Sequence, residues 1–381
     1  MNLKRKAFLC LLLGLSIWFP VAGQKAQPSP PGASPEFDQF AHFIAGRPTG
    51  RAPWAALERT PSWQDHAQQC NRAWLRLERN QLSRIRTWSS VELKEAIAEG
   101  RALFYPFGGP DFLYAQAFFP SASDYILVGL EPAGSLPDWQ SFSEENWDEY
   151  LTELLKSLEE VLDFTFFRTD DMKEHLEGQE GSGILPMLLF FLARTGHEVL
   201  GIDRVYILPN GEVGASEDFR KPRRPGTHLI ARRIRFRAPS GGRRNLYYFP
   251  LDLSNYSLQR RPGFAAFLKK RRPLSSFVKA ASYLMHRPAF SDVRSLLINE
   301  SRYLLQDDSG IPVEHFEASK WQLRFYGRYD KPIKLFEERH QPALEKLYRQ
   351  AKYVPALSFG FGYRLSAAQS NLMLARRIEK R

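Results

Sequence analysis

Cysteine is almost absent from the 381-residue chain, which contains only Cys10 and Cys70. Cys10 lies in an N-terminal segment that is expected to be removed, so a mature chain would keep one thiol. One thiol cannot form an internal disulfide and cannot supply the clustered cysteines of a zinc site. The fold should therefore depend on its hydrophobic core, and Cys70 is interpreted as a half-buried helix residue instead of a nucleophile.

The familiar catalytic motifs are also missing. The sequence has no G-x-S-x-G nucleophile elbow, no phosphate loop ending in G-K-[ST], no H-E-x-x-H and no Cys/His cluster. These absences argue against α/β-hydrolases, P-loop nucleotide hydrolases and zinc peptidases. The eight histidines are scattered along the chain, and no metal site is predicted.

Only the N-terminus carries a long apolar run. The basic stretch Lys4–Lys6 is followed by apolar residues up to about Ala22 and by small residues that fit cleavage after Gly23. This is the three-part pattern of a secretory signal peptide. An uncleaved membrane anchor is less favoured, because the run contains Pro20 and falls short of the ~20 residues that a spanning helix needs. We therefore expect an exported chain, periplasmic or extracellular, without a transmembrane segment after residue 23.

The remaining composition is that of a folded protein. Hydrophobic residues make up 43% and aromatic residues 13% of the chain, which is enough for a large core. Residues 24–37 are rich in Pro and Ser and are predicted to be a linker. Residues 38–226 are predicted to form an α/β core. Residues 227–381 should add a hairpin and a mixed α+β part that belongs either to the same domain or to a second one.

Strand and helix patterns alternate up to residue 226. Helices are predicted over 61–87 and 89–99, with capping boxes at Ser62 and Ser89 and a stop at Gly100. The alternation is typical of a mostly parallel sheet with helices on both faces, so the fold is predicted to be α/β and Rossmann-like. The alternating segments are 102–107, 111–119, 124–132, 144–162, 164–168, 183–196 and 198–208.

Beyond residue 226 the pattern changes. Segments 228–238 and 245–253, joined by a glycine-containing turn, predict an antiparallel hairpin. The sequence leaves open whether the strands that follow extend the first sheet or form a smaller one. Helices are predicted at 264–270, 274–285, 291–299 and 342–353, and strands at 302–308 and 320–329.

The stretch RALFYPFGGPDFLYA, residues 101–115, contains a turn of particular interest. Gly108 and Gly109 lie between a buried strand and a helix, where glycines let the backbone approach a ligand closely. Glu131 ends the next strand, 22 residues after Gly109, where dinucleotide- and adenosylmethionine-binding folds carry an acid for ribose hydroxyls. These residues resemble the first βαβ unit of class I methyltransferases, which implies a cofactor site at Gly108, Gly109, Asp111 and Glu131.

The same turn departs from that pattern. It lacks the G-x-G-x-x-G spacing, Pro110 removes a backbone donor, and Asp111 would repel a phosphate. An aspartate in this position is also a good helix cap. The turn is therefore either a cofactor site or a purely structural turn. Adenosylmethionine and nicotinamide nucleotides are the candidate cofactors, although both are expected to be scarce outside the cytoplasm.

Basic residues are concentrated around the predicted hairpin. Residues 220–272 contain sixteen Lys or Arg against one acid, and cleavage after residue 23 would lower the net charge from +11 to about +8. Alternate hairpin positions place arginines on one face and Ile234 and Phe236 on the other. The expected partner is an anionic lipid or envelope polymer, with nucleic acid less favoured; the alternative is a solvated face. The predicted anion-binding residues are Arg233, Arg235, Arg237, Arg243 and Arg244.

Adjacent carboxylates, Asp307 and Asp308, stand at the end of a predicted strand. Such a pair could bind a metal or act as acid and base. Asp-Ser-Gly is also a common turn sequence, and consecutive side chains on a strand point to opposite faces. The turn is the favoured interpretation.

Several segments, among them LVGLEPAG and LQDDSGIP, also resemble exported bacterial proteins whose activity is not known, so this resemblance implies no catalytic residue. Two hypotheses follow. The first is an exported protein that binds an anionic envelope component through the arginine-rich hairpin. The second is an enzyme on a methyltransferase-like scaffold with its pocket at Gly108 and Gly109. An open pocket over these glycines would favour the second hypothesis, and a filled one the first.

Overall fold

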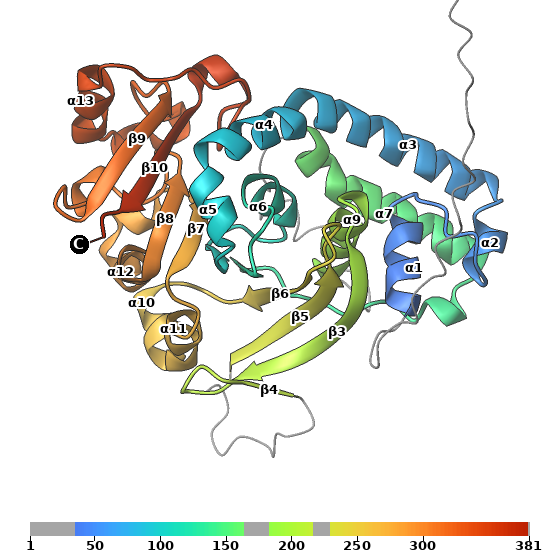
Figure 1. Cartoon of the computed structure of the whole chain (residues 1–381). Coiled ribbons are helices and arrows are strands. Elements are labelled where there is room, and N and C mark those ends of the chain that lie inside the picture. The colour runs from blue at the N-terminus through green and yellow to red at the C-terminus, as the bar shows by residue number, and fades with distance from the viewer. Residues whose placement is uncertain (1–34, 164–182, 216–228, 380–381) are drawn as a thin grey trace, which may run out of the picture.

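A ten-stranded mixed sheet runs through the molecule, with helices packed on it (Figure 1). The computed structural model describes residues 35–163, 183–215 and 229–379. The predicted signal peptide, most of the predicted linker and the strand expected at 164–168 lie outside the described residues. The strands are β1 (Leu103–Tyr105), β2 (Asp124–Gly129), β3 (Glu198–Ile207), β4 (Val213–Ala215), β5 (Leu229–Arg237), β6 (Arg243–Pro250), β7 (Leu274–Val278), β8 (Ser301–Gln306), β9 (Trp321–Gly327) and β10 (Asn371–Arg377).

The strand order is β4-β3-β5-β6-β2-β1-β7-β8-β10-β9. The five central strands, from β6 to β8, are mutually parallel. The outer strands on both sides pair antiparallel with their neighbours. The α/β class is therefore confirmed, but the sheet is mixed, and the expected mostly parallel order holds only for its centre. Short connections such as the β5–β6 turn can join only antiparallel neighbours, which explains the difference.

The late strands extend the first sheet instead of forming a second one, since β8, β9 and β10 continue it beyond β7. Two assignments in this part were missed. Residues 274–285, predicted as a helix, form β7 and the loop that follows it. Strand β10 was not predicted at all, although it pairs with both β8 and β9.

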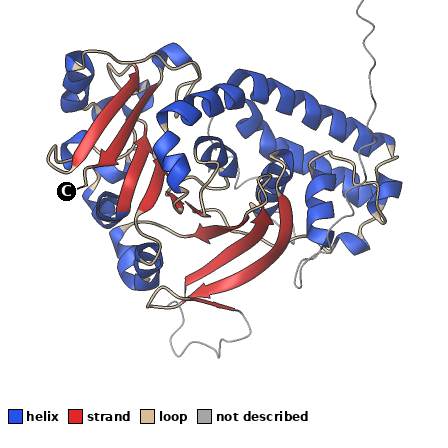
Figure 2. Cartoon of the chain, viewed as in Figure 1, coloured by secondary structure: helices blue, strands red, loops and turns tan. Residues whose placement is uncertain are grey.

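Helices cover both faces of the sheet (Figure 2). One face carries the helices from α1 to α9, and the other carries α10 to α13. No helix in the described ranges combines the length and the apolar character that spanning a membrane requires. The helices are α1 (Pro35–Ile44), α2 (Trp54–Leu57), α3 (Pro61–Leu77), α4 (Ser83–Glu92), α5 (Lys94–Glu99), α6 (Phe112–Phe118), α7 (Glu144–Asp163), α9 (Leu185–Arg194), α10 (Asn255–Arg260), α11 (Pro262–Lys269), α12 (Ser291–Glu300) and α13 (Pro342–Gln350).

The pattern of burial along β1 explains why both faces are needed. Leu103 and Tyr105 belong to the core under one helical layer, and Phe104 belongs to the core under the other. All three side chains are at most 1% exposed. Because successive side chains of a strand point to opposite faces, a continuous apolar strand is stable only between two covered faces.

The N-terminal helices differ in detail from the prediction. Residues 35–37, assigned to the linker, form the first turn of α1. Thr60 caps α3 in place of Ser62, and a π-helical turn at Glu78–Leu82 joins α3 to α4, so Ser89 lies inside a helix. Gly100 ends α5 in the left-handed conformation, as predicted. Cys70 is fully buried on α3 instead of half-buried.

Candidate functional site

A cavity of about 730 Å³ lies at the carboxyl ends of the central parallel strands. Its walls are the segments that directly follow β1, β2, β6 and β7. After β1 the chain continues to β2 on one side, and later to β7 on the other side of β1. Such a switch point at the carboxyl edge of a parallel sheet is where open α/β folds place their ligands. The volume is in the range of small-molecule sites.

Backbone strain is concentrated in two loops beside this cavity. Four non-glycine residues of the described chain have positive φ angles of 49° to 59°. One follows β1 and three follow β7, and these two strands are neighbours. Left-handed backbone is costly for residues with a side chain and tends to occur at functional sites. The strained residues are Phe107, Ala280, Ser282 and Tyr283.

The Gly108-Gly109 turn lies in the wall of the cavity, as the second hypothesis requires. A Cβ atom at Gly108 would lie 2.7 Å from the Tyr105 ring, and Gly109 has a φ of 54°, so both positions need glycine. The backbone N–H groups of Gly109, Asp111 and Phe112 donate to carbonyl oxygens inside the protein. Because these donors are already used, the turn is poorly suited to cradle a phosphate.

Asp111 both caps a helix and lines the cavity. Its Oδ1 accepts a hydrogen bond from the backbone N–H of Tyr114, 3.1 Å away, at the start of α6. Its Oδ2 accepts from the Tyr105 hydroxyl at 2.9 Å and from the Lys279 ammonium group. Burial raises the pKa of Asp111 and lowers the pKa of Lys279, while the attraction between the two groups opposes both shifts. Lys279, which the sequence did not single out, therefore belongs to the site.

Two further carboxylates stand at the ends of neighbouring strands. Glu131 follows β2 and is only 4% exposed; its carboxylate lies 3.3 Å from the Tyr248 hydroxyl, which also donates to the Glu131 carbonyl oxygen at 2.9 Å. Asp252 follows β6 and accepts hydrogen bonds from the N–H and hydroxyl of Ser254. Both line the cavity. The cavity therefore brings Gly108, Gly109, Asp111 and Glu131 together and adds Asp252.

The strained loop after β7 is held by buried groups from the loop after β8. Asp307 accepts from the N–H of Ala280 at 3.1 Å, and the hydroxyl of Ser309 accepts from the N–H of Ala281 at 2.7 Å. Asp307 also accepts from the N–H of Ser309, two residues on, which confirms the predicted turn. Burial, followed by repulsion from Asp308, raises the pKa of Asp307 to about 7. These carboxylates thus position a wall of the cavity.

The predicted anion-binding arginines lie on β5 and β6, away from this cavity. Arg233 and Arg235 both contact the Asp203 carboxylate of β3 at 3.0 Å. Their positive charge is therefore partly compensated within the sheet, and binding of an anionic lipid or polymer stays a prediction. The other three are placed differently: Arg237 pairs with Glu198, Arg244 donates to the carbonyl oxygen of Pro120, and Arg243 is exposed.

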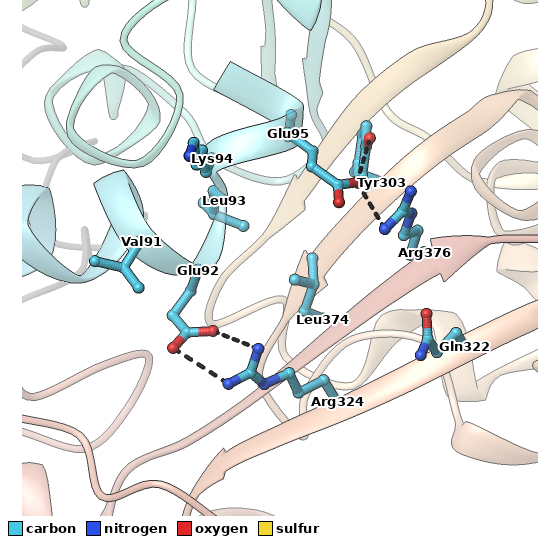
Figure 3. Close-up of a pocket in the computed structure, with 11 residues that line it drawn as sticks. Val91, Glu92, Leu93, Lys94, Glu95, Tyr303, Gln322, Arg324, Leu374 and Arg376 are labelled. Atoms are coloured by element: carbon cyan, nitrogen blue, oxygen red, sulfur yellow. Dashed lines mark hydrogen bonds and ion pairs between the residues drawn. The ribbon is translucent and has the colours of Figure 1, made fainter. Parts of the chain in front are cut away.

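A second cavity, of about 350 Å³, lies between the α4–α5 segment and strands β8 to β10 (Figure 3). Its charged side chains pair with one another: Glu92 contacts Arg324 at 2.9 Å, and Glu95 contacts Arg376 at 2.6 Å. The Tyr303 hydroxyl lies 3.4 Å from Glu95 on the same side. These pairs attach the helices to the sheet, so a structural role accounts for the charges that line this cavity.

No group of three or more potential metal ligands occurs in the part of the chain that the structure describes. Asp307 and Asp308 form hydrogen bonds with neighbouring protein groups, including the Tyr283 hydroxyl and the Asn371 amide on Asp308. In comparisons with known proteins, no family model, no curated protein and no solved structure matches the chain.

Proposed function

We propose that the protein is an enzyme on a methyltransferase-like scaffold and that its large cavity binds a nucleoside-type cofactor, with adenosylmethionine as the candidate. The observation that carries the proposal is the open cavity over Gly108 and Gly109 with Glu131 in its wall. The structural-turn alternative required this space to be filled. The strained loops on either side of the cavity support the same conclusion.

The order of the strands also supports it. Taken in chain order, the five parallel strands follow the sequence third-second-first-fourth-fifth, the order of Rossmann-type nucleotide-binding folds. Beyond them the antiparallel β10 is inserted between β8 and β9. This insertion resembles the sheet of class I methyltransferases and extends the resemblance beyond the first βαβ unit.

The polarity of the cavity distinguishes between the candidate cofactors. Glu131 and Asp252 contribute negative charge, and Lys279 is already paired with Asp111. A dinucleotide would bring two phosphates next to these carboxylates, at a turn whose N–H groups are used internally. Adenosylmethionine carries no phosphate and has a positively charged sulfonium. The cavity therefore suits adenosylmethionine better than a nicotinamide dinucleotide.

The residues present fit such a ligand. Glu131 would accept hydrogen bonds from the ribose hydroxyls, and Asp252 offers an acceptor for an amino group from the neighbouring strand end. The Lys279–Asp111 pair would keep the inner wall rigid, which helps to position a bound ligand. When bound, adenosylmethionine supplies an electrophilic methyl group for transfer to an acceptor.

Calorimetry on the purified chain tests the proposal. We expect adenosylmethionine or its demethylated product to bind and NAD to bind far more weakly. Glu131→Gln should weaken binding about tenfold, which corresponds to roughly 1.4 kcal/mol for a lost charge-assisted hydrogen bond. Asp138→Asn, at an exposed position outside the cavity, is the matched control and should bind normally. No binding of either adenosyl compound would refute the proposal.

Cell fractionation complements this experiment, because the predicted signal peptide and the proposed cofactor point to different compartments. If the chain is exported, its cofactor has to reach it outside the cytoplasm or be retained from before export. We therefore expect protein purified from the compartment in which it accumulates to release an adenosyl compound on denaturation, detectable by mass spectrometry.

A further inference from the structure

The outer half of the large cavity is apolar, in contrast to its inner wall. The carboxylates and Lys279 line the inner part, next to the strand ends. Aromatic and aliphatic side chains from three separate segments line the rest. Those that matter here are Phe107, Leu130, Phe290, Leu335 and Phe336.

Two of these leucines are unusually exposed. Leu130 is 61% and Leu335 is 74% exposed, although both line the cavity. Single exposed leucines are common, but two beside one cavity form a continuous apolar surface with the rings next to them. Phe107 and Phe290 meet edge to face with ring centroids 6.0 Å apart. Phe107 adopts the left-handed conformation, at a cost in backbone energy, in the loop that lines this part of the cavity.

We propose that this outer half is the acceptor site and that it takes a molecule with an apolar group, either an aliphatic chain or an aromatic ring. The inference rests on the proposed function, since it assigns the second substrate of the same cavity. An apolar acceptor would cover Leu130 and Leu335 and would exclude water from the carboxylates of the inner wall. Pockets of this kind bind through apolar contacts and are oriented by a few polar groups.

Binding of the neutral fluorescent probe N-phenyl-1-naphthylamine tests the inference. Leu335→Asp should weaken binding of the probe at least tenfold, whereas Leu335→Met should leave it unchanged. Leu75→Asp is the matched control, because Leu75 is 61% exposed on α3 and does not line the cavity. Since Leu335 is exposed, its replacement should not prevent folding. Equal effects of Leu335→Asp and Leu75→Asp, or no binding by the unmodified chain, would overturn the inference.

Two further measurements separate this inference from the proposed function and identify the apolar group. Glu131→Gln should lose affinity for adenosylmethionine and keep its affinity for the probe. If the unmodified chain binds the probe at Leu335 but no adenosyl compound, the proposed function fails and the apolar site stands. Displacement of the probe by 1-decanol would indicate an aliphatic acceptor, and displacement by 1-naphthol an aromatic one. Failure of both to compete would count against the inference.

Discussion

The ammonium group of Lys279 donates a hydrogen bond to the carboxylate of Asp111, across 168 positions of the chain. Both side chains are only 2% exposed. The ammonium group also lies 3.6 Å from the centre of the Tyr114 ring. The pair connects the loop after β7 to the start of α6 and thereby fixes the inner wall of the cavity. Because both charges are buried, each depends on the other for compensation.

Removing one member of this pair should destabilise the protein strongly. Lys279→Met leaves the Asp111 carboxylate buried without its cation, which typically costs about 3–5 kcal/mol. Urea denaturation should show this loss as a lower midpoint. In the double variant Lys279→Met/Asp111→Asn no charge remains, and asparagine still caps the helix. The double variant should therefore regain part of the stability; equal or greater loss would show that the two groups are not coupled.

Gly129 should not tolerate a side chain. A Cβ atom there would clash with the Glu131 carboxylate and would lie 2.7 Å from the Tyr248 hydroxyl and 2.8 Å from the Cα of Gly109. Gly129→Ala should therefore cost about 1–3 kcal/mol by overpacking and should weaken adenosylmethionine binding at least tenfold. In Gly242→Ala the new methyl group meets no atom within 4 Å, so this control should stay within about 0.5 kcal/mol of the unmodified chain.

Asp307 should make the stability depend on pH. Its pKa is about 7 in the folded protein, against 3.8 for an ordinary aspartate. Between these values the folded state keeps a proton that the unfolded state has released, so the contribution of Asp307 to stability is present below pH 4 and is lost as the pH rises towards 7. Asp307→Asn cannot release this proton. Its free energy of unfolding should fall less between pH 4 and 7 than that of the unmodified chain.

Buried histidines titrate over the same range with the opposite sign. Burial lowers the pKa of each to about 4, so their contribution to stability is lost as the pH falls from 6.5 to 4. They are unchanged in Asp307→Asn, and the difference between variant and unmodified chain isolates Asp307. Parallel pH profiles of the two proteins would contradict the assignment. The histidines are His66, His197 and His286.

The arginine-rich hairpin can be tested through the acid that compensates it. Asp203→Asn removes the carboxylate that Arg233 and Arg235 share. If the hairpin contacts anionic lipid, this variant should bind vesicles of phosphatidylcholine and phosphatidylglycerol about fivefold more tightly at low salt, at roughly 1 kcal/mol per charge. Asp148→Asn, an exposed acid on α7, is the control with the same change in net charge. Equal binding of both variants would indicate that the hairpin does not touch lipid.

Local sequence patterns were sufficient to locate the Gly108-Gly109 turn, its capping aspartate and the acid at Glu131, because each depends on residues close in the chain. The same patterns failed at β7. Its sequence LSSFVKAASYLM has apolar residues at spacings compatible with a helix, and only pairing with β1 and β8 makes it a strand. The error concealed Lys279, which directly follows that strand.

The sequence by itself determined the α/β class, the antiparallel hairpin and the position of the glycine turn, since hydrophobic periodicity and turn chemistry are local properties. Only the tertiary structure decided that the late strands join the same sheet, that Lys279 meets Asp111, and that Asp203 compensates the arginines of the hairpin. It also decided that the turn lies beside an open cavity. These features depend on contacts between residues distant in sequence, which periodicity and spacing do not encode.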